Sequence, residues 1–304
     1  MLHRYSHKGV TWVDSEIPSD EEINSLVEEF DLDFRLGEEL STRSFKPYMR
    51  RFNGTLYVAL YFPALKHSHN DDKLQEVNFV LGGDFLITNH YDTIDPLHKL
   101  AKTFEVEEIT SNEDVGENVS SVFYRIVRKL YRSVLYEIEF QRDELLEIEA
   151  HIFDGNEASA VEKLSRESLN LLVIEQTLAT HKNLLEDLSV ALSSFLEKDA
   201  SDVSESIYSE YDKVVEKAKS NRGLVDELRK TNDALLVTKQ NEVMKTFTIL
   251  AFITFPLSVV AGIFGMNTES TPLVSDPNGF WYILAIMAFT GLVFYVIFRY
   301  KRWL

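Results

Sequence analysis

The sequence TFTILAFITFPLSVVAGIFGMNT, residues 246–268, has no Asp, Glu, Lys or Arg in 23 positions. A second uncharged stretch, from Pro277 to Phe298, has 22 residues. About 20 apolar residues are enough for a helix to cross a hydrocarbon core about 30 Å thick, so each stretch is a predicted membrane span. Gly265-Met266-Asn267 is expected to end the first span and to open a short loop, 265–279, before the second span at 280–298.

The charges that flank the two spans indicate their orientation. Lys245 lies just before the first span and the tail 299–304 is basic, whereas the loop holds only the acids Glu269 and Asp276. The positive-inside rule then places both termini in the cytoplasm. We therefore expect a plasma (inner) membrane protein with two spans joined by an extracytoplasmic loop.

Charge is divided unevenly along the 304 residues. The net charge is −18, and residues 241–304 contribute +1, so residues 1–240 carry −19. Nucleic acid is not an expected partner, because backbone binding needs clustered Lys and Arg. Surplus acid suits divalent cations, and it also serves solubility. The chain has no cysteine, which excludes disulfides and thiolate sites, and no nucleophile–base pattern or cofactor loop predicts an enzyme.

Residues 1–112 have the pattern of an α/β domain with a mixed sheet. Gly82-Gly83-Asp84 is typical of a hairpin turn, because it lacks the spacing and the Lys of a phosphate-binding loop. His67, His69 and the acids 71–72 could form a metal cluster, but without further ligands a polar hairpin loop is the favoured interpretation. The predicted strands are residues 10–14, 57–62, 77–81 and 85–88, and the predicted helix is 18–33.

Beyond this domain the apolar residues recur at the helical spacing of three to four. Residues 113–199 are predicted to form two long antiparallel helices, the first of which ends near Asp154-Gly155. Residues 200–264 are predicted to form one uninterrupted helix, which comprises a stalk and the first span. A helix of about 60 residues is roughly 90 Å long, and two spans per chain enclose too little for an aqueous path. We therefore expect a symmetric bundle of identical chains around an axis.

The membrane end of the chain resembles the CorA family of magnesium transporters. The order of the soluble segments agrees as well, so the resemblance covers essentially the whole chain. It implies a funnel-shaped homopentamer in which the long helices line the pore. The stretches that carry it are Asn241-Glu-Val-Met-Lys245, Phe255-Pro-Leu257, Ala261-Gly-Ile-Phe-Gly-Met-Asn267 and Tyr300-Lys-Arg-Trp-Leu304.

The tripeptide Gly265-Met266-Asn267 is the expected selectivity filter. Mg²⁺ gives up its water reluctantly, so a ring of Asn267 amide oxygens with Gly265 carbonyls would suit a hydrated ion without holding it too tightly. Asn267 could also serve as a helix C-cap, and both roles can coexist. Glu269 and Asp276 would attract cations to the outer mouth. Family members commonly have Met-Pro-Glu where this chain has Thr271-Pro272-Leu273, so one acid is absent.

One face of the first span is the predicted pore lining. Phe255, Phe247 and Met244 are candidate gates, because apolar constrictions can close a pore by dewetting. Phenylalanine would equally suit a face toward lipid. Counting back from the tripeptide at a spacing of three to four residues places these residues on the side of the helix that faces the pore. The predicted pore-lining residues are Asn241, Met244, Phe247, Ala251, Phe255, Ser258 and Gly262.

The resemblance also implies a regulatory Mg²⁺ site between the α/β domain of one subunit and the stalk of the next. Glu39 matches the acid of the α/β domain. The stalk position falls on Ser206, and Asp202, Glu205 and Glu210 near it could replace the usual acid. A solvated acidic face is an equally good interpretation of these residues.

The sequence thus predicts transport of Mg²⁺ by a pentameric channel, with Mg²⁺ as cargo and regulator and no organic cofactor. One alternative is the related zinc branch, which typically has Val where this chain has Met266. Co²⁺ or Ni²⁺ could also pass. A more distant alternative is a membrane-anchored coiled-coil scaffold that conducts no ion.

Overall fold

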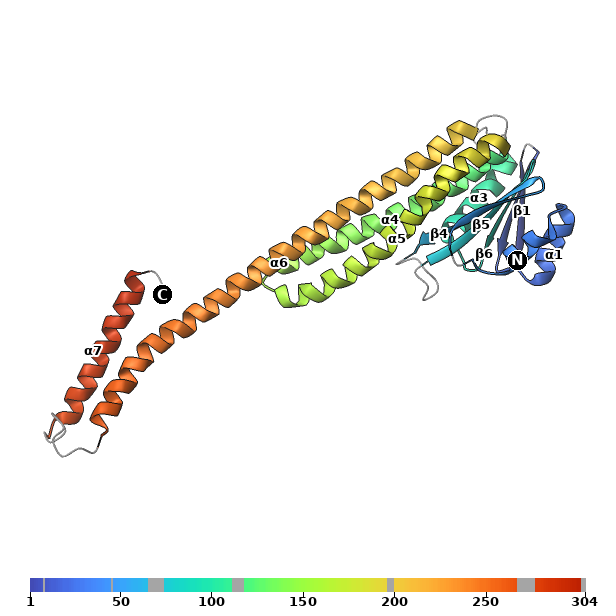
Figure 1. The fold of residues 1–304 in the computed structure, drawn as a ribbon. Coiled ribbons are helices and arrows are strands. Elements are labelled where there is room, and N and C mark those ends of the chain that lie inside the picture. Colours follow the sequence, from blue (N-terminus) through green and yellow to red (C-terminus); the bar gives the residue numbers. More distant parts are fainter. Residues whose placement is uncertain are drawn as a thin grey trace. The chain divides into compact units, whose positions relative to one another are not determined.

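The computed structural model describes residues 1–7, 9–44, 46–64, 74–110, 118–195, 200–266 and 277–301 (Figure 1). These residues form two units, Met1–Arg229 and Lys230–Leu304, and the boundary lies within the long helix α6, Ala200–Phe264. Each unit is described by itself below. The segment with His67, His69 and the acids 71–72 lies outside the described residues.

The first unit is built around one mixed sheet of six strands in the order β1-β2-β6-β5-β4-β3. Among the described strands, β2 and β6 form the one parallel pair, with Val13 opposite Ile87. β4 and β5 are buried along almost their whole length, as central strands covered on both faces are. β4 is a near-continuous apolar run, whereas β5 also buries polar Gln75, Glu76 and Asn78. The strands are β1 (Leu2–His7), β2 (Val10–Glu16), β3 (Tyr48–Phe52), β4 (Thr55–Pro63), β5 (Leu74–Leu81) and β6 (Phe85–His90).

Two short helices, α1 (Asp20–Glu29) and α2 (Phe34–Ser41), cover one face of this sheet. α1 begins with a capping box, in which Ser19 accepts from the Glu22 backbone N–H and the Glu22 carboxylate accepts from the Ser19 N–H. The apolar residues of both helices meet alternate residues of the strands. The buried cluster includes Leu26, Leu36, Leu40, Tyr57, Val80 and Ile87.

The opposite face of the sheet is covered by α3 (Asp95–Thr110), α4 (Val119–Phe153) and α5 (Glu157–Phe195), which gives three layers. Aromatic rings join the layers: Phe79 meets Phe123 edge-on with centroids 5.1 Å apart, and Trp12 meets Phe104 at 4.9 Å. α4 ends at Phe153, and Gly155 reverses the chain with a φ of +87°, as the sequence predicted for Asp154-Gly155.

Buried His181 of α5 ties this helix to α4 and to the sheet. Its Nε2 lies 2.7 Å from the Tyr61 carbonyl oxygen, which can only accept, so Nε2 carries the proton. The Tyr131 hydroxyl, 2.9 Å away, then donates to Nδ1. Burial lowers the pKa of His181 to about 4. The imidazole is therefore neutral and both of its nitrogens are satisfied.

The first part of α6 packs along α4 and α5 within the same unit (Figure 1). Its buried stripe of apolar residues is interrupted by Asn221, whose amide donates to the Ile138 carbonyl at 2.8 Å. A buried polar group of this kind fixes the register of two helices, because a shifted pairing would leave it unsatisfied.

The second unit contains the rest of α6 and α7 (Gly279–Tyr300). Both α6 and α7 are long and apolar enough to cross a membrane, with a mean hydropathy of 2.2 over their most apolar windows. Of these membrane stretches, Ile249 and Phe298 have buried side chains, and the Phe252 and Phe298 rings lie 6.3 Å apart. Most of the apolar surface of this helical hairpin is exposed.

The predicted strands at 10–14, 57–62, 77–81 and 85–88 are confirmed as parts of β2, β4, β5 and β6. The prediction of one helix over 18–33 was wrong at its end. α1 stops at Glu29, Asp31 adopts a φ of +48°, and Asp33 caps α2 through the Arg35 N–H. The sequence pattern missed β1, α2, β3 and α3.

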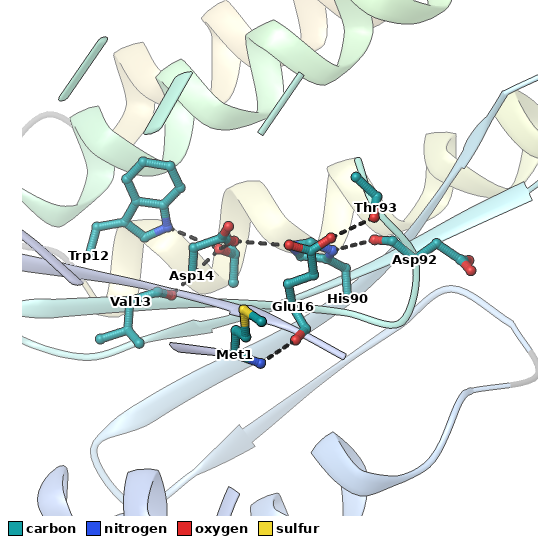
Figure 2. A network of polar contacts seen from close by, with 9 residues as sticks. Met1, Trp12, Val13, Asp14, Glu16, His90, Asp92 and Thr93 are labelled. Atoms are coloured by element: carbon teal, nitrogen blue, oxygen red, sulfur yellow. Dashed lines mark hydrogen bonds and ion pairs between the residues drawn. The ribbon is translucent and has the colours of Figure 1, made fainter. Parts of the chain in front are cut away.

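A buried polar network joins the two parallel strands β2 and β6 (Figure 2). His90 Nδ1 lies 2.5 Å from the Asp92 carbonyl and its Nε2 lies 3.2 Å from the Asp14 carboxylate. Both neighbours only accept, so the site suits an imidazolium with two N–H groups. Asp14 also accepts from the Thr88 hydroxyl, which in turn accepts from the Trp12 indole. Burial lowers the pKa of His90, but Asp14 and the Asp92 carbonyl outweigh burial, and the net pKa is raised.

Replacing Asp14 with Asn is expected to destabilise the protein more at pH 6 than at pH 9. A raised pKa means that protonated His90 stabilises the fold fully below the ordinary value of 6.5, and that this contribution is lost as the pH rises through the folded pKa. Breaking a buried ion pair costs about 3–5 kcal/mol. Thermal unfolding of the purified chain in detergent at the two pH values measures this.

The matched control is Glu29→Gln, which removes an exposed pair with Arg4 at 2.7 Å and should cost less than about 1 kcal/mol at either pH. An equal loss of stability for Asp14→Asn at pH 6 and pH 9 would show that His90 is not charged in the folded protein.

Candidate functional site

α6 ends where the sequence places the end of the first span. Its last residue is Phe264, and the Gly265 N–H donates to the Ala261 carbonyl at 2.9 Å. The Met266 N–H donates to the Ile263 carbonyl at 3.3 Å, so the last turn tightens from a four-residue to a three-residue spacing. Asn267, and with it the outer-mouth acids Glu269 and Asp276, lies outside the described residues.

One side of α6 in the second unit faces α7. Ile249 is buried there and the others of this set are half-buried. At about 100° per residue, the set spans less than a third of the helix circumference. Its members are Ile249, Ile253, Pro256, Leu257, Val260 and Phe264.

The predicted pore face lies on the opposite side of α6. Its residues are all exposed within the chain, and the large side chains are among the most exposed, with Phe255 at 72% and Phe247 at 64%. Met244, Phe247, Ala251, Phe255, Ser258 and Gly262 fall within one arc by the same count of about 100° per residue. Asn241 is exposed too, but by the same count it lies about 40° beyond the edge of that arc.

This exposed face carries no charge and combines bulky with small residues. The Ser258 hydroxyl donates to the Thr254 carbonyl at 2.9 Å, so its oxygen keeps lone pairs for a further donor such as water. A Cβ added at Gly262 would meet no atom of the described residues within 4 Å. The chain's own packing therefore does not explain the small residue at position 262.

Glu39, the predicted regulatory acid of the α/β domain, is engaged within its own chain. Its Oε1 accepts from Arg50 at 2.5 Å, and its Oε2 accepts from the Tyr48 hydroxyl. Burial and the neighbouring Glu39 carboxylate raise the pKa of Tyr48 to about 12, so this hydroxyl remains a donor. Sequence reasoning missed both partners. Residues 48 and 50 share one face of a strand, which would have been the signal had β3 been predicted.

The predicted stalk acids lie on the first turns of α6. Glu210 forms ion pairs with Lys213 at 3.1 Å and with Arg128 at 3.6 Å. Glu205 and Asp202 are exposed. Among the described residues, no group of three or more His, Asp and Glu side chains could hold a metal ion. A single chain therefore does not bring Glu39 and the stalk acids into one metal site.

Comparison with known proteins identifies the family. A family model described as "CorA-like Mg2+ transporter protein" matches residues 7–302, which is nearly the whole chain. The chain belongs to the CorA family. The protein is therefore a membrane transporter of Mg²⁺ or a related divalent cation, and it is not an enzyme. Its α6 and α7 are the two candidate membrane spans of a CorA protein.

Individual CorA relatives match over most of their own length. The cobalt/magnesium transport protein CorA of Methanocaldococcus jannaschii is 24% identical over 96% of this chain and 91% of the relative. The putative metal ion transporter YfjQ of Bacillus subtilis is 25% identical over 96% and 89%. The complete structure of the CorA magnesium transporter from M. jannaschii superposes with a TM-score of 0.84, at 21% identity, over 97% of this chain and 92% of that chain. The mixed sheet, long helices and two C-terminal apolar helices are thus the CorA fold.

Proposed function

We propose that the protein is a homopentameric channel that passes hydrated Mg²⁺ through the inner membrane, with both termini in the cytoplasm. The observation that carries the proposal is the face of α6 opposite α7, which is exposed, uncharged and apolar within one chain. A water-filled path needs more than two helices. Copies arranged around an axis would cover part of this surface and leave the rest as the wall of a pore.

In this proposal, Asn267 selects the ion at the outer end of the pore. A ring of neutral amide oxygens, with carbonyls from Gly265, contacts the hydration shell of Mg²⁺ without stripping it. Neutral oxygens also bind weakly enough for the ion to leave, whereas a ring of carboxylates would retain it. Glu269 and Asp276 raise the local cation concentration outside.

Rings of Phe255, Phe247 and Met244 gate the pore by excluding water. An ion that keeps its hydration shell cannot cross a narrow apolar ring, because the ring offers no polar group in place of bulk solvent. Widening the ring by a small movement of α6 readmits water. The gate thus opens by a change in the radius of the pore and not by a change in the charge of its lining.

Aqueous thiol reagents are expected to distinguish the two sides of α6. The chain has no cysteine, so single-cysteine variants have no background. Phe255→Cys and Ser258→Cys should react with a charged methanethiosulfonate reagent and lose Mg²⁺ flux in proteoliposomes, because both positions face the pore, which contains water whenever the gate is open. Ile253→Cys and Val260→Cys, on the side toward α7, are the controls and should be protected. Equal reaction on both sides would refute the assigned pore face.

Replacing Asn267 with Ala is expected to reduce Mg²⁺ uptake into proteoliposomes by roughly tenfold or more, because a neutral oxygen is removed from every subunit of the ring. Asn278→Ala is the matched control, since Asn278 precedes α7 without forming a side-chain cap. Mg²⁺, Zn²⁺ and Co²⁺ should be compared under equal gradients. Faster Zn²⁺ flux would assign the protein to zinc transport, and absence of any flux would favour the non-conducting scaffold.

We further propose that intracellular Mg²⁺ closes the channel by binding between Glu39 of one subunit and the Asp202–Glu205 segment, with Glu210, of the next. Two exposed acids at the start of α6 support this assignment. Arg50 opposes it, because its guanidinium already pairs with the Glu39 carboxylate at 2.5 Å. Mg²⁺ must displace Arg50, so the pair would set the Mg²⁺ concentration at which the channel responds.

Mg²⁺ bound at this site is expected to protect the protein from trypsin. Arg50→Ala should lower the Mg²⁺ concentration needed for protection by roughly twofold to fivefold, since an exposed ion pair contributes up to about 1 kcal/mol. Glu39→Ala should abolish protection. Arg4→Ala, which breaks the exposed pair with Glu29, is the control and should leave the Mg²⁺ dependence unchanged. If Arg50→Ala has no effect or weakens protection, the regulatory site does not include Glu39.

A further inference from the structure

A hollow of about 600 Å³ lies between α3 and α4 in the first unit. Its volume falls within the range of small-molecule sites, about 300–1,000 Å³. Neither the transport path nor the proposed regulatory site uses it. It is lined by Asp95, Pro96, Lys99, Lys129, Arg132, Ser133, Tyr136 and Phe140.

Three cations line this hollow in a part of the chain that carries −19 overall. Lys99 comes from α3, and Lys129 and Arg132 come from α4. Among the described residues none of the three forms an ion pair, whereas Arg128, the residue before Lys129, pairs with Glu210. Three cations that line one hollow repel one another, and an anion bound between them would relieve this repulsion.

Aromatic rings continue the same lining. Tyr136 lies seven residues after Lys129 and Phe140 eleven after it, so all three project from one face of α4. The Tyr136 side chain is 68% exposed, so a ligand can reach its ring from solvent. The Ser133 hydroxyl, between the cations and the rings, adds a polar contact.

We propose that this hollow binds a nucleotide. The phosphates would lie among Lys99, Lys129 and Arg132, where charge-assisted hydrogen bonds are strongest. The base would stack on Tyr136 and Phe140, because every nucleobase has a π-face that an aromatic ring can contact. Asp95 in the same lining disfavours a ligand that is all phosphate, and its carboxylate can accept from ribose hydroxyls. This inference does not depend on the proposed channel mechanism.

The test is calorimetric titration of the full-length protein in detergent with ATP, tripolyphosphate and adenosine, without added Mg²⁺. Saturable binding of ATP is expected, with tripolyphosphate and adenosine each at least roughly tenfold weaker, since each lacks one half of the contacts. Lys129→Ala and Arg132→Ala should each weaken ATP binding roughly tenfold or more, as loss of a charge-assisted hydrogen bond predicts. Tyr136→Ala should weaken ATP and leave tripolyphosphate unchanged.

Lys163→Ala is the matched control, because Lys163 is an exposed cation on α5 outside the hollow. Thermal unfolding and size-exclusion elution establish that each variant is folded and assembled. Arg132→Lys keeps the charge and should retain most of the affinity.

Three outcomes would overturn the proposal. The first is no saturable ATP binding. The second is equal binding of ATP and tripolyphosphate with no effect of Tyr136→Ala, which would leave a site for anions alone. The third is dissociation of the oligomer in Lys129→Ala or Arg132→Ala with ATP binding unchanged, which would assign these cations to a contact between copies. These binding measurements are independent of the Mg²⁺ flux measurements. A failure of the proposed channel function would not change them.

Discussion

The constraint on which the rest of the membrane unit depends is that α6 and α7 cannot cover each other. A helix in a hydrocarbon core satisfies its own backbone, so its outer surface is free to be apolar on every side. Two such helices contact along one narrow side, where Ile249 and Phe298 are buried and little else is. The opposite side of α6 has no partner among the described residues of this unit. The sequence therefore specifies a helical hairpin that can cross the membrane but cannot enclose a pore by itself.

The features that were predictable from sequence are those set by local pattern. The spans follow from runs without charge, the end of α6 from Gly265, and the turn after α4 from Gly155 at a φ of +87°. What the pattern missed depends on contacts between distant residues. β3 is short and half-exposed, and it exists because Thr55–Pro63 offers it an edge. The partners of Glu39 come from that strand, so their pairing could not be foreseen either.

The first unit contains two buried histidines that differ in charge for a simple reason. His181 faces one carbonyl and one hydroxyl, and the hydroxyl can turn to donate, so a neutral ring satisfies both. His90 faces a carbonyl and a carboxylate, neither of which can donate, so only the imidazolium fits. The residue type alone carried no sign of this difference. It is decided by which atoms the fold places within 3.2 Å or less of each ring.

Pro256 has a mechanical consequence for α6. Because proline has no N–H, the carbonyl of Phe252 lacks its usual helical donor. A helix bends most easily where a backbone hydrogen bond is missing. The nine residues from Pro256 to Phe264 can thus tilt as a short lever about this hinge. A hinge at Pro256 allows the stalk to move without an equal displacement of Gly265-Met266. The end of α6 can therefore keep its position even when the stalk bends.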